Sequence, residues 1–365
     1  MLERIVDVTT DLVAIPTYET EGTAQAHLAE ILEAAGFECT LQEIAPDRPN
    51  LIARRGDAGG TFVCSHMDTH PPHGHPEPFV CRRRGEVLVG RGVLDAKGQI
   101  AALVAAVEAD PDAPVTIAIT CDEEFGGLGS ERLDIGDGPW RADGGIVLEP
   151  TGFRVCVAQG GHVDLSVEAS APATHAYAQS GHPSPIDVVL DAVEALRGLP
   201  FLARRHPLLA PPRVHLGTIH GGEHLWRTPE RANAEVAIGL VPGVGEEEAR
   251  EQIAATIESV TRSWNVEGGS FLFDIADASP AIEIPHDLPI VRRLFSVVGA
   301  DAEVAGMSSW TDAANLLLHH DVGCVVFGAG ELETAHSNLE SVTTTDLVRL
   351  ASTLVDLFRT DGTAR

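Results

Sequence analysis

Residues 62–74 read FVCSHMDTHPPHG, a short apolar run followed by histidines and an aspartate. The apolar residues predict a buried strand, and open α/β sheets place their sites at the carboxyl ends of strands. In an extended segment, residues i and i+2 share a face, so His66 and Asp68 lie on the same side. A histidine that binds a metal usually has its second ring nitrogen held by a carboxylate or carbonyl. The pattern favours His66 as a metal ligand oriented by Asp68, although such a pair also occurs in ordinary loops.

Three further histidines follow at the end of this stretch: His70, His73 and His75. We interpret them as residues of a pocket rim or a loop rather than as ligands. A rim rich in histidine could also bind metal by itself.

Other segments place acidic residues and a histidine at comparable positions. Asp95 lies in the turn before an alanine-rich helix, where a carboxylate can bridge two cations or complement the helix dipole. Glu123 and Glu124 follow the apolar run VTIAIT and point apart in an extended chain, so one can bind metal while the other acts as a general base. Glu149 ends the run GGIVL, and His336 follows GCVVFGAG. Each of these residues alone is also compatible with a solvated side chain.

Together these residues indicate a metal centre. His66, Asp95, Glu124, Glu149 and His336 supply oxygen and nitrogen donors suited to zinc or cobalt, without a thiolate. If two metals shared Asp95, each would gain one histidine and one further carboxylate. Positions would remain open for water and substrate.

The composition excludes several classes of partner. The chain carries 25 Lys plus Arg against 54 Asp plus Glu, a net charge of −29, and its single lysine is Lys97. Binding to nucleic acid or to an anionic membrane requires cations, so neither is expected. A heavily acidic, lysine-poor surface suits a host that lives in high salt, or an ordinary acidic cytosolic enzyme.

The cysteines and the N-terminus indicate the cytoplasm. The N-terminal residues MLERIVDVTTDLV are acidic from the start and lack the order of a secretory signal. No CxxC pair is present among the six cysteines, so a structural zinc ribbon is not expected. We interpret them as free thiols in a reducing compartment.

The hydrophobic pattern predicts two domains, as does the length of 365 residues. Helices and continuous apolar strands alternate up to about residue 158 and again after 280, which is typical of a mixed α/β layer. Between them the order is β-α-β-β-α-β, a ferredoxin-like unit of α+β type. We therefore predict an α/β domain of residues 1–158 and 281–365 that carries the metal centre. A smaller domain of residues 159–280 is inserted into it.

Five ordered motifs give the chain a resemblance to the M20 metallopeptidases, the group of acetylornithine deacetylase, succinyl-diaminopimelate desuccinylase, aminoacylase and glutamate carboxypeptidase. The motifs are SHMDTHPP, GRGVLDAKGQIAAL, TCDEEFGGLGS, VLEPTG and AHSNLE. The resemblance runs over essentially the whole chain. It implies a zinc-exopeptidase-like catalytic domain with a mixed sheet, and a lid that commonly dimerises.

The resemblance also implies roles for individual residues. His66 and Glu149 would hold one of two divalent ions, zinc or cobalt, and Glu124 and His336 would hold the other. Asp95 would bridge the two ions.

Three further roles follow from the same resemblance. Glu123 would be the general base that takes a proton from water and delivers it to the leaving amine, and Asp68 would support the metal site. His175 in the lid segment ATHAYAQSGHPSP would polarise the scissile carbonyl, with His182 as its rival and a plain loop histidine as the alternative for either.

Two positions depart from the family pattern. Trp226 stands where an asparagine is common, and Gly239 stands where an arginine is common. Those residues usually bind the substrate, so the substrate class is left open. Arginine binds carboxylates well through paired hydrogen bonds. Another arginine of the lid could therefore replace the missing substrate contacts, or it could be an ordinary solvated side chain. The candidates are Arg213, Arg227 and Arg231. In the segment SSWTDAANL, Ser308 and Ser309 could donate hydrogen bonds to the substrate.

The resemblance implies a metal-dependent hydrolase of linear amide bonds. The expected substrate is an N-acyl amino acid of arginine or lysine biosynthesis. A dipeptidase or carboxypeptidase of the same family is the alternative. A binding protein without turnover is a third possibility, which the presence of Glu123 disfavours.

Overall fold

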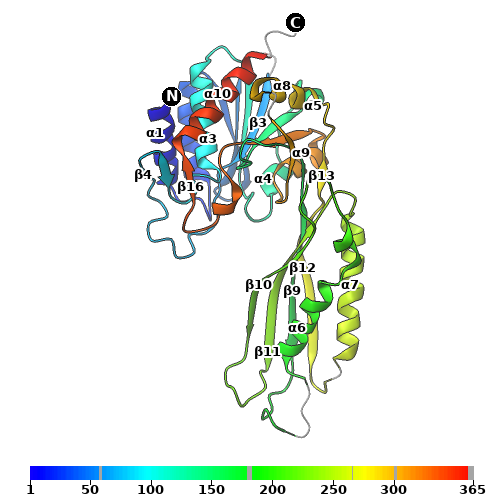
Figure 1. Ribbon diagram of the computed structural model, residues 1–365. Coiled ribbons are helices and arrows are strands. Elements are labelled where there is room, and N and C mark those ends of the chain that lie inside the picture. Colours follow the sequence, from blue (N-terminus) through cyan, green and yellow to red (C-terminus); the bar gives the residue numbers. More distant parts are fainter. Residues whose placement is uncertain (57–59, 179–182, 265, 300–301, 361–365) are drawn as a thin grey trace. The chain divides into compact units, whose positions relative to one another are not determined.

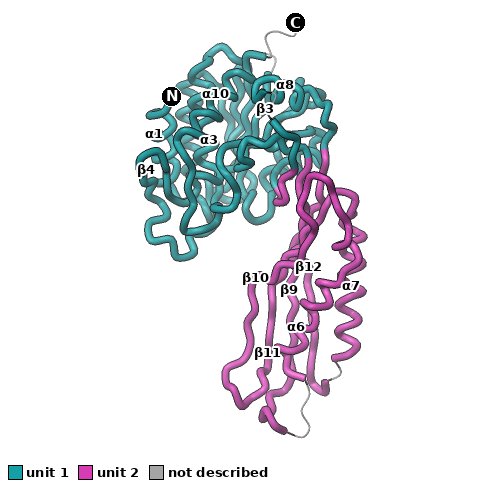
Figure 2. Tube along the Cα trace, in the orientation of Figure 1, with its two compact units in different colours: residues 1–157, 284–305, 311–365 teal, residues 158–283, 306–310 magenta. Residues whose placement is uncertain are grey.

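The computed structural model describes residues 1–56, 60–178, 183–264, 266–299 and 302–360. The chain divides into two compact units, which Figure 2 shows in different colours. The segments of unit 1 are Met1–Val157, Ile284–Ala305 and Thr311–Arg365. The segments of unit 2 are Ala158–Glu283 and Gly306–Trp310.

Four parallel strands form the centre of the main sheet (Figure 1). They are β3 (Thr61–His66), β6 (Val115–Thr120), β7 (Gly145–Leu148) and β15 (Cys324–Phe327), in the spatial order β6-β3-β7-β15. Every residue of these four strands is buried. Their continuous apolar runs reflect a parallel sheet that is covered on both faces.

Further strands extend this sheet on both sides. On one side β2 (Arg48–Arg55) pairs with β6, and β1 (Glu38–Ala45) pairs with β2. On the other side β8 (Val155–Gln159) pairs with β15. Next to β8 lie β13 (Ile282–Glu283) and β14 (Val304–Met307).

Three long helices of unit 1 pack against one another: α1 (Leu2–Val13), α3 (Lys97–Ala109) and α10 (Thr344–Thr360) (Figure 1). The side chain of Lys97 is buried and donates hydrogen bonds from Nζ to the carbonyl oxygens of Leu12 (3.0 Å) and Ile15 (2.8 Å). The remaining helices of the unit are α2 (Gly22–Ala34), α4 (Leu128–Glu131), α5 (Trp140–Asp143), α8 (Pro289–Val298), α9 (Ala313–His320) and the 3-10 helix η2 (Leu332–Thr334).

A small three-stranded sheet of unit 1 was not anticipated from the sequence. It consists of β4 (Arg82–Arg84), β5 (Val87–Val89) and β16 (Ser341–Thr343), in the order β16-β5-β4. The sequence of β4 is three arginines, whose side chains are exposed, so no apolar pattern marks it. This sheet brings the residues that follow His336 beside those that precede Asp95.

Unit 2 has the predicted order β-α-β-β-α-β. Its elements are β9 (Gly161–Ser170), α6 (Pro185–Leu196), β10 (Val214–Gly221), β11 (Arg231–Leu240), α7 (Glu246–Ser263) and β12 (Ser270–Ser279), with a 3-10 helix, η1 (Pro200–Ala203), after α6. The antiparallel sheet has the order β10-β11-β9-β12. Buried residues alternate with partly exposed ones along β9, because the helices cover one face only. The predicted fold class, a mixed α/β layer with a ferredoxin-like α+β unit, is confirmed.

No helix in the described part of the chain is long and apolar enough to cross a bilayer.

The turn that carries Asp95 depends on a glycine. A Cβ atom on Gly98, near the start of α3, would lie 2.0 Å from the carbonyl oxygen of Val93. We expect Gly98→Ala to displace this turn and to lower the free energy of unfolding by about 1–3 kcal/mol, the usual cost of overpacking. Thermal unfolding of the purified chain measures the loss. Gly217→Ala is the control, because its nearest contact would be an ordinary 3.5 Å. Equal midpoints for the two variants would contradict the expectation.

Candidate active site

The carboxyl ends of the four parallel strands deliver most of the candidate residues. His66 is the last residue of β3, and Glu149 directly follows β7. Glu123 and Glu124 follow β6, and His336 lies in the loop after β15. Because parallel strands end at the same edge of a sheet, residues far apart in the sequence meet there. Asp95 reaches the same place from the turn before α3.

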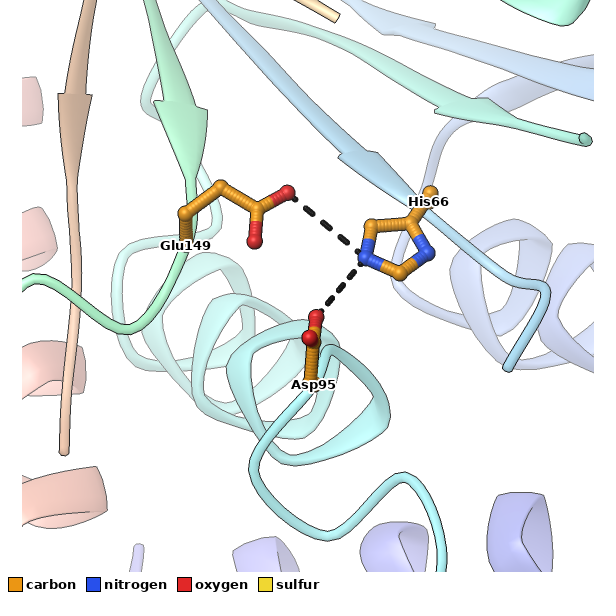
Figure 3. Close-up of side chains that lie close together, drawn as sticks. All are labelled: His66, Asp95 and Glu149. Carbon is orange, nitrogen blue, oxygen red and sulfur yellow. Dashed lines mark hydrogen bonds and ion pairs between the residues drawn. The ribbon is translucent and has the colours of Figure 1, made fainter. Parts of the chain in front are cut away.

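One group of donors consists of His66, Asp95 and Glu149 (Figure 3). The Nε2 atom of His66 lies 3.0 Å from Oδ1 of Asp95 and 3.6 Å from Oε1 of Glu149. All three side chains are buried. One ligand atom from each lies within 4.8 Å of the others, close enough for a single ion.

A second group consists of Asp95, Glu124 and His336. The Nε2 atom of His336 lies 2.8 Å from Oε2 of Glu124 and 3.5 Å from Oδ2 of Asp95. Asp95 thus presents one carboxylate oxygen to each group. This is the arrangement expected of a carboxylate that bridges two cations.

Asp68 supports the backbone of the glutamate pair. Its carboxylate accepts hydrogen bonds from the backbone N–H of Glu123 (3.1 Å) and of Glu124 (2.9 Å). The Nδ1 atom of His66 lies nearer to the backbone carbonyl of Asp68 (3.1 Å) than to its carboxylate (3.5 Å). The carbonyl is therefore the nearer group to orient the imidazole, and the carboxylate fixes the loop that carries Glu123 and Glu124. The i, i+2 spacing of His66 and Asp68 did not predict the contact between the Asp68 carboxylate and the backbone of Glu123 and Glu124.

The crowding of carboxylates shifts the protonation of the site. Burial raises the pKa of Glu123 well above its usual value; His66 opposes the shift, and the neighbouring charge of Glu149 adds to it. Burial also raises the pKa of Glu149, again opposed by His66. Burial lowers the pKa of His66, but the charges of Glu123 and Glu149 outweigh it and leave that pKa well above its usual value. These three groups of the metal-free site therefore bind protons more tightly than exposed Glu and His side chains do.

The donors fit a pair of divalent ions. Four carboxylates face two imidazoles, and oxygen and nitrogen donors of this kind suit zinc or cobalt. In the described structure the Oε1 atom of Glu149 is buried and accepts no hydrogen bond, an arrangement that is costly unless a cation completes it. The six cysteines are free, and none belongs to either group.

The other histidines of the first motif lie around these groups. The ring of His70 stacks on His336, with centroids 4.4 Å apart, and lies 4.9 Å from the ring of His73. The backbone N–H of His70 donates to Oε1 of Glu124 (2.8 Å). Burial, followed by the charges of His336 and His73, lowers the pKa of His70 to about 4. Neither these two nor His75 belongs to a donor group of the described residues.

Sequence reasoning overlooked Asp312, which lies three residues after Ser309 in the segment SSWTDAANL. Its side chain is buried and accepts a hydrogen bond from the hydroxyl of Thr120 (2.5 Å), the last residue of β6. Burial raises the pKa of Asp312 to about 6. Ser308 accepts a hydrogen bond from the backbone N–H of Ala210 (3.2 Å). Ser309 donates to the backbone carbonyl of the next residue, Trp310 (3.3 Å).

His175 lies in an exposed loop of unit 2. Its Nδ1 atom accepts a hydrogen bond from the backbone N–H of Tyr177 (3.2 Å), and its backbone forms a bridge with Arg227. His182, the rival histidine, lies outside the described residues. Their proposed part in catalysis stays a prediction.

The three candidate arginines of unit 2 differ in their surroundings. Arg227 pairs with Glu223 (3.4 Å) and Glu230 (2.5 Å), which neutralise its charge. Arg231 and Arg227 both line a cavity of about 330 Å³, together with His220 and Asn233. Arg213 is exposed just before β10. That any of the three receives a substrate carboxylate stays a prediction.

The sequence matches the model of peptidase family M20/M25/M40 over residues 62–360. An acetylornithine deacetylase of Vibrio cholerae is 27% identical over 331 residues, which cover 87% of this chain and 86% of that protein. A probable carboxypeptidase of Aspergillus clavatus is 28% identical over 368 residues, which cover 91% of this chain and 77% of that protein.

Solved structures share the fold at low sequence identity. A di-peptidase of Saccharomyces cerevisiae superposes with a TM-score of 0.83 at 13% identity, covering 99% of this chain and 96% of that chain. Human carnosine dipeptidase 1 gives a TM-score of 0.80 at 15% identity, covering 99% and 97%. At these identities the likeness establishes the fold alone.

We expect the metal-free chain to bind two zinc ions, and His336→Ala to bind one, because that variant removes a donor from one group only. Both affinities should fall as the pH falls, because protons compete with the metal for the donors. Those protons sit on His66 and Glu149 in the first group and on Glu124 and His336 in the second, whose pKa values are all raised. Calorimetric titration at several pH values, with elemental analysis of the dialysed protein, measures stoichiometry and affinity.

His73→Ala is the matched control, because it removes an exposed histidine of the same neighbourhood and should leave two ions bound. Two ions in His336→Ala, or one in the parent chain, would contradict the assignment.

Proposed function

Since this chain belongs to the M20/M25/M40 peptidase family and is a metallohydrolase of amide bonds, we propose that it removes the acyl group from an N-acyl amino acid. The observation that supports the chemistry best is the pair of donor groups that share Asp95, with Glu123 beside them. The sequence similarity to the acetylornithine deacetylase of Vibrio cholerae, 27% identity over most of both chains, supports an N-acyl amino acid as the substrate class.

In the proposed centre, His66 and Glu149 would hold one metal, and Glu124 and His336 would hold the other. Asp95 would be shared between them. A bound pair of zinc or cobalt ions would supply Lewis-acid polarisation of the scissile carbonyl and would lower the pKa of water.

Glu123 acts as the general base in this proposal. It accepts a proton from the attacking water and returns it to the nitrogen of the leaving amine, so that the amide bond breaks without a free hydroxide. Burial raises the pKa of Glu123 well above its usual value, which makes its carboxylate a stronger base than an exposed glutamate. Asp68 holds the backbone N–H of Glu123 and thereby fixes where this base stands.

The two units would have different roles. We propose that residues 1–158 and 281–365 form the catalytic domain, and that residues 159–280 form a lid that also mediates a homodimer. His175 would donate a hydrogen bond to the oxyanion that develops on the substrate carbonyl.

A peptidase of the same family is the second candidate. The probable carboxypeptidase of Aspergillus clavatus is as similar as the deacetylase. Gly239 also lies where an arginine is common in the family, which favours a substrate outside the usual acyl amino acids. Both substrate classes contain a linear amide bond and a free carboxylate.

A substrate panel separates the two candidates. We expect the zinc- or cobalt-loaded chain, assayed with raised salt, to release acetate from N-acetylornithine or succinate from N-succinyl-diaminopimelate. Product amines and acids can be followed by mass spectrometry. Cleavage confined to dipeptides would support the second candidate, and a loaded chain that leaves every N-acyl amino acid intact would overturn the first.

We expect Glu123→Gln to keep both metals and to lose about 10²- to 10⁴-fold in kcat, the usual contribution of a general base. The amide has nearly the same shape as the carboxylate but accepts no proton from water. Rate measurements on the best substrate, paired with metal analysis, test the role.

Glu333→Gln is the control, because Glu333 is exposed in η2 and belongs to neither donor group. Parental kcat in Glu123→Gln would show that another residue is the base.

A further inference from the structure

Arg91 and Glu340 form a buried ion pair in unit 1 to which the proposed mechanism gives no role. The Nη1 atom of Arg91 donates to Oε2 of Glu340 at 2.7 Å. Each side chain is only 1% exposed. Removing two charges from water is costly, and the cost is offset only where further hydrogen bonds satisfy the remaining donors and acceptors. The further hydrogen bonds of Arg91 and Glu340 show which backbone segments this ion pair positions.

The second oxygen of Glu340 holds the turn that leads into Asp95. Its Oε1 atom accepts hydrogen bonds from the backbone N–H of Gly92 (2.7 Å), Leu94 (3.2 Å) and Asp95 (3.4 Å). Asp95 is the residue shared by both donor groups. A single carboxylate thus fixes the backbone beneath the proposed bridging ligand.

The second nitrogen of Arg91 holds two other segments of the site. Its Nη2 atom donates to the backbone carbonyl of His336 (3.3 Å) and to that of Pro71 (3.3 Å). His336 is a donor of the second group, and Pro71 belongs to the loop that starts at His66 and Asp68. The planar guanidinium offers several donors in a fixed fork, so it can hold both carbonyls and the carboxylate at once.

The small sheet brings the two partners together. Ser341 of β16 pairs with Val89 of β5, and the backbone N–H of Gly90 donates to the carbonyl of Glu340 (3.4 Å). Glu340 therefore lies beside the turn that carries Asp95, although the two are far apart in the sequence.

We propose that Arg91 and Glu340 are positioning residues that hold the Asp95 turn, the His336 loop and the loop after His66 in register for metal binding. The inference rests on the proposed metal centre. It assigns to the pair an effect on metal affinity that a purely structural ion pair would not have.

Two conservative variants test it. Glu340→Gln keeps the shape but places an amide donor against either Arg91 or the backbone N–H groups. Arg91→Lys keeps the charge but loses the fork that reaches His336 and Pro71. We expect both to weaken zinc binding roughly 10- to 100-fold, the usual effect of removing support from a ligand. Arg91→Lys should act chiefly on the ion that His336 holds.

The readouts are calorimetric zinc titration and thermal unfolding of the metal-free protein. Arg55→Lys is the matched control, because Arg55 is a partly buried arginine that donates to the backbone carbonyls of Ala35, Val107, Asp110 and Ala113. None of these residues belongs to a donor group. We expect Arg55→Lys to lower the unfolding midpoint and to leave both zinc affinities unchanged.

A parent chain that binds two ions, together with variants that bind both ions at parental affinity, would overturn the inference even if their unfolding midpoints fall. A parent chain that binds no pair of ions would instead contradict the proposed function. If Glu340→Gln does not fold, Arg91→Lys alone decides, because it retains the ionic contact with Glu340.

Discussion

Repulsion among carboxylates at the edge of the parallel sheet is the constraint on which the rest of the structure depends. Asp95, Glu123, Glu124 and Glu149 converge there, and among the described residues His66 and His336 oppose their charges. Burial makes each uncompensated charge costly, and their proximity adds to the cost. In the metal-free chain this cost appears as raised pKa values at Glu123 and Glu149. Two divalent cations would remove the same cost and leave the carboxylates ionised.

The loops around this site are held by buried polar side chains. Asp68 accepts from the backbone of Glu123 and Glu124. Gln99 of α3 donates to the carbonyl of Leu94 and exchanges two hydrogen bonds with Ala329 after β15. Such contacts fix ligands that loops alone would leave loose, since a metal site requires its donors within a few tenths of an ångström. The parallel strands determine where each loop leaves the sheet. The hydrogen bonds of Asp68 and Gln99 then fix the path of the loop backbone that carries the donors.

The acidic composition and the site are separate properties. The net charge of −29 is spread over the chain, whereas the site uses a few buried carboxylates whose geometry is fixed by the fold. Salt adaptation and a cytoplasmic location therefore stay predictions from composition. Trp226 and Gly239 of unit 2 depart from the usual family pattern, and their part in selecting the substrate also stays a prediction.

The sequence by itself determined the buried parallel strands of unit 1, the order of the elements in unit 2 and every residue of the two donor groups. It could do so because buried parallel strands are continuous apolar runs, and because ligands follow the ends of those runs in motifs. Only the tertiary structure revealed that the Asp68 carboxylate accepts from the backbone of the two glutamates, that Asp312 accepts a hydrogen bond from Thr120 of β6, and that Arg91 pairs with Glu340. These contacts join segments far apart in the chain, and β4 and β16 are too short and too polar to predict the small sheet that brings Arg91 and Glu340 together.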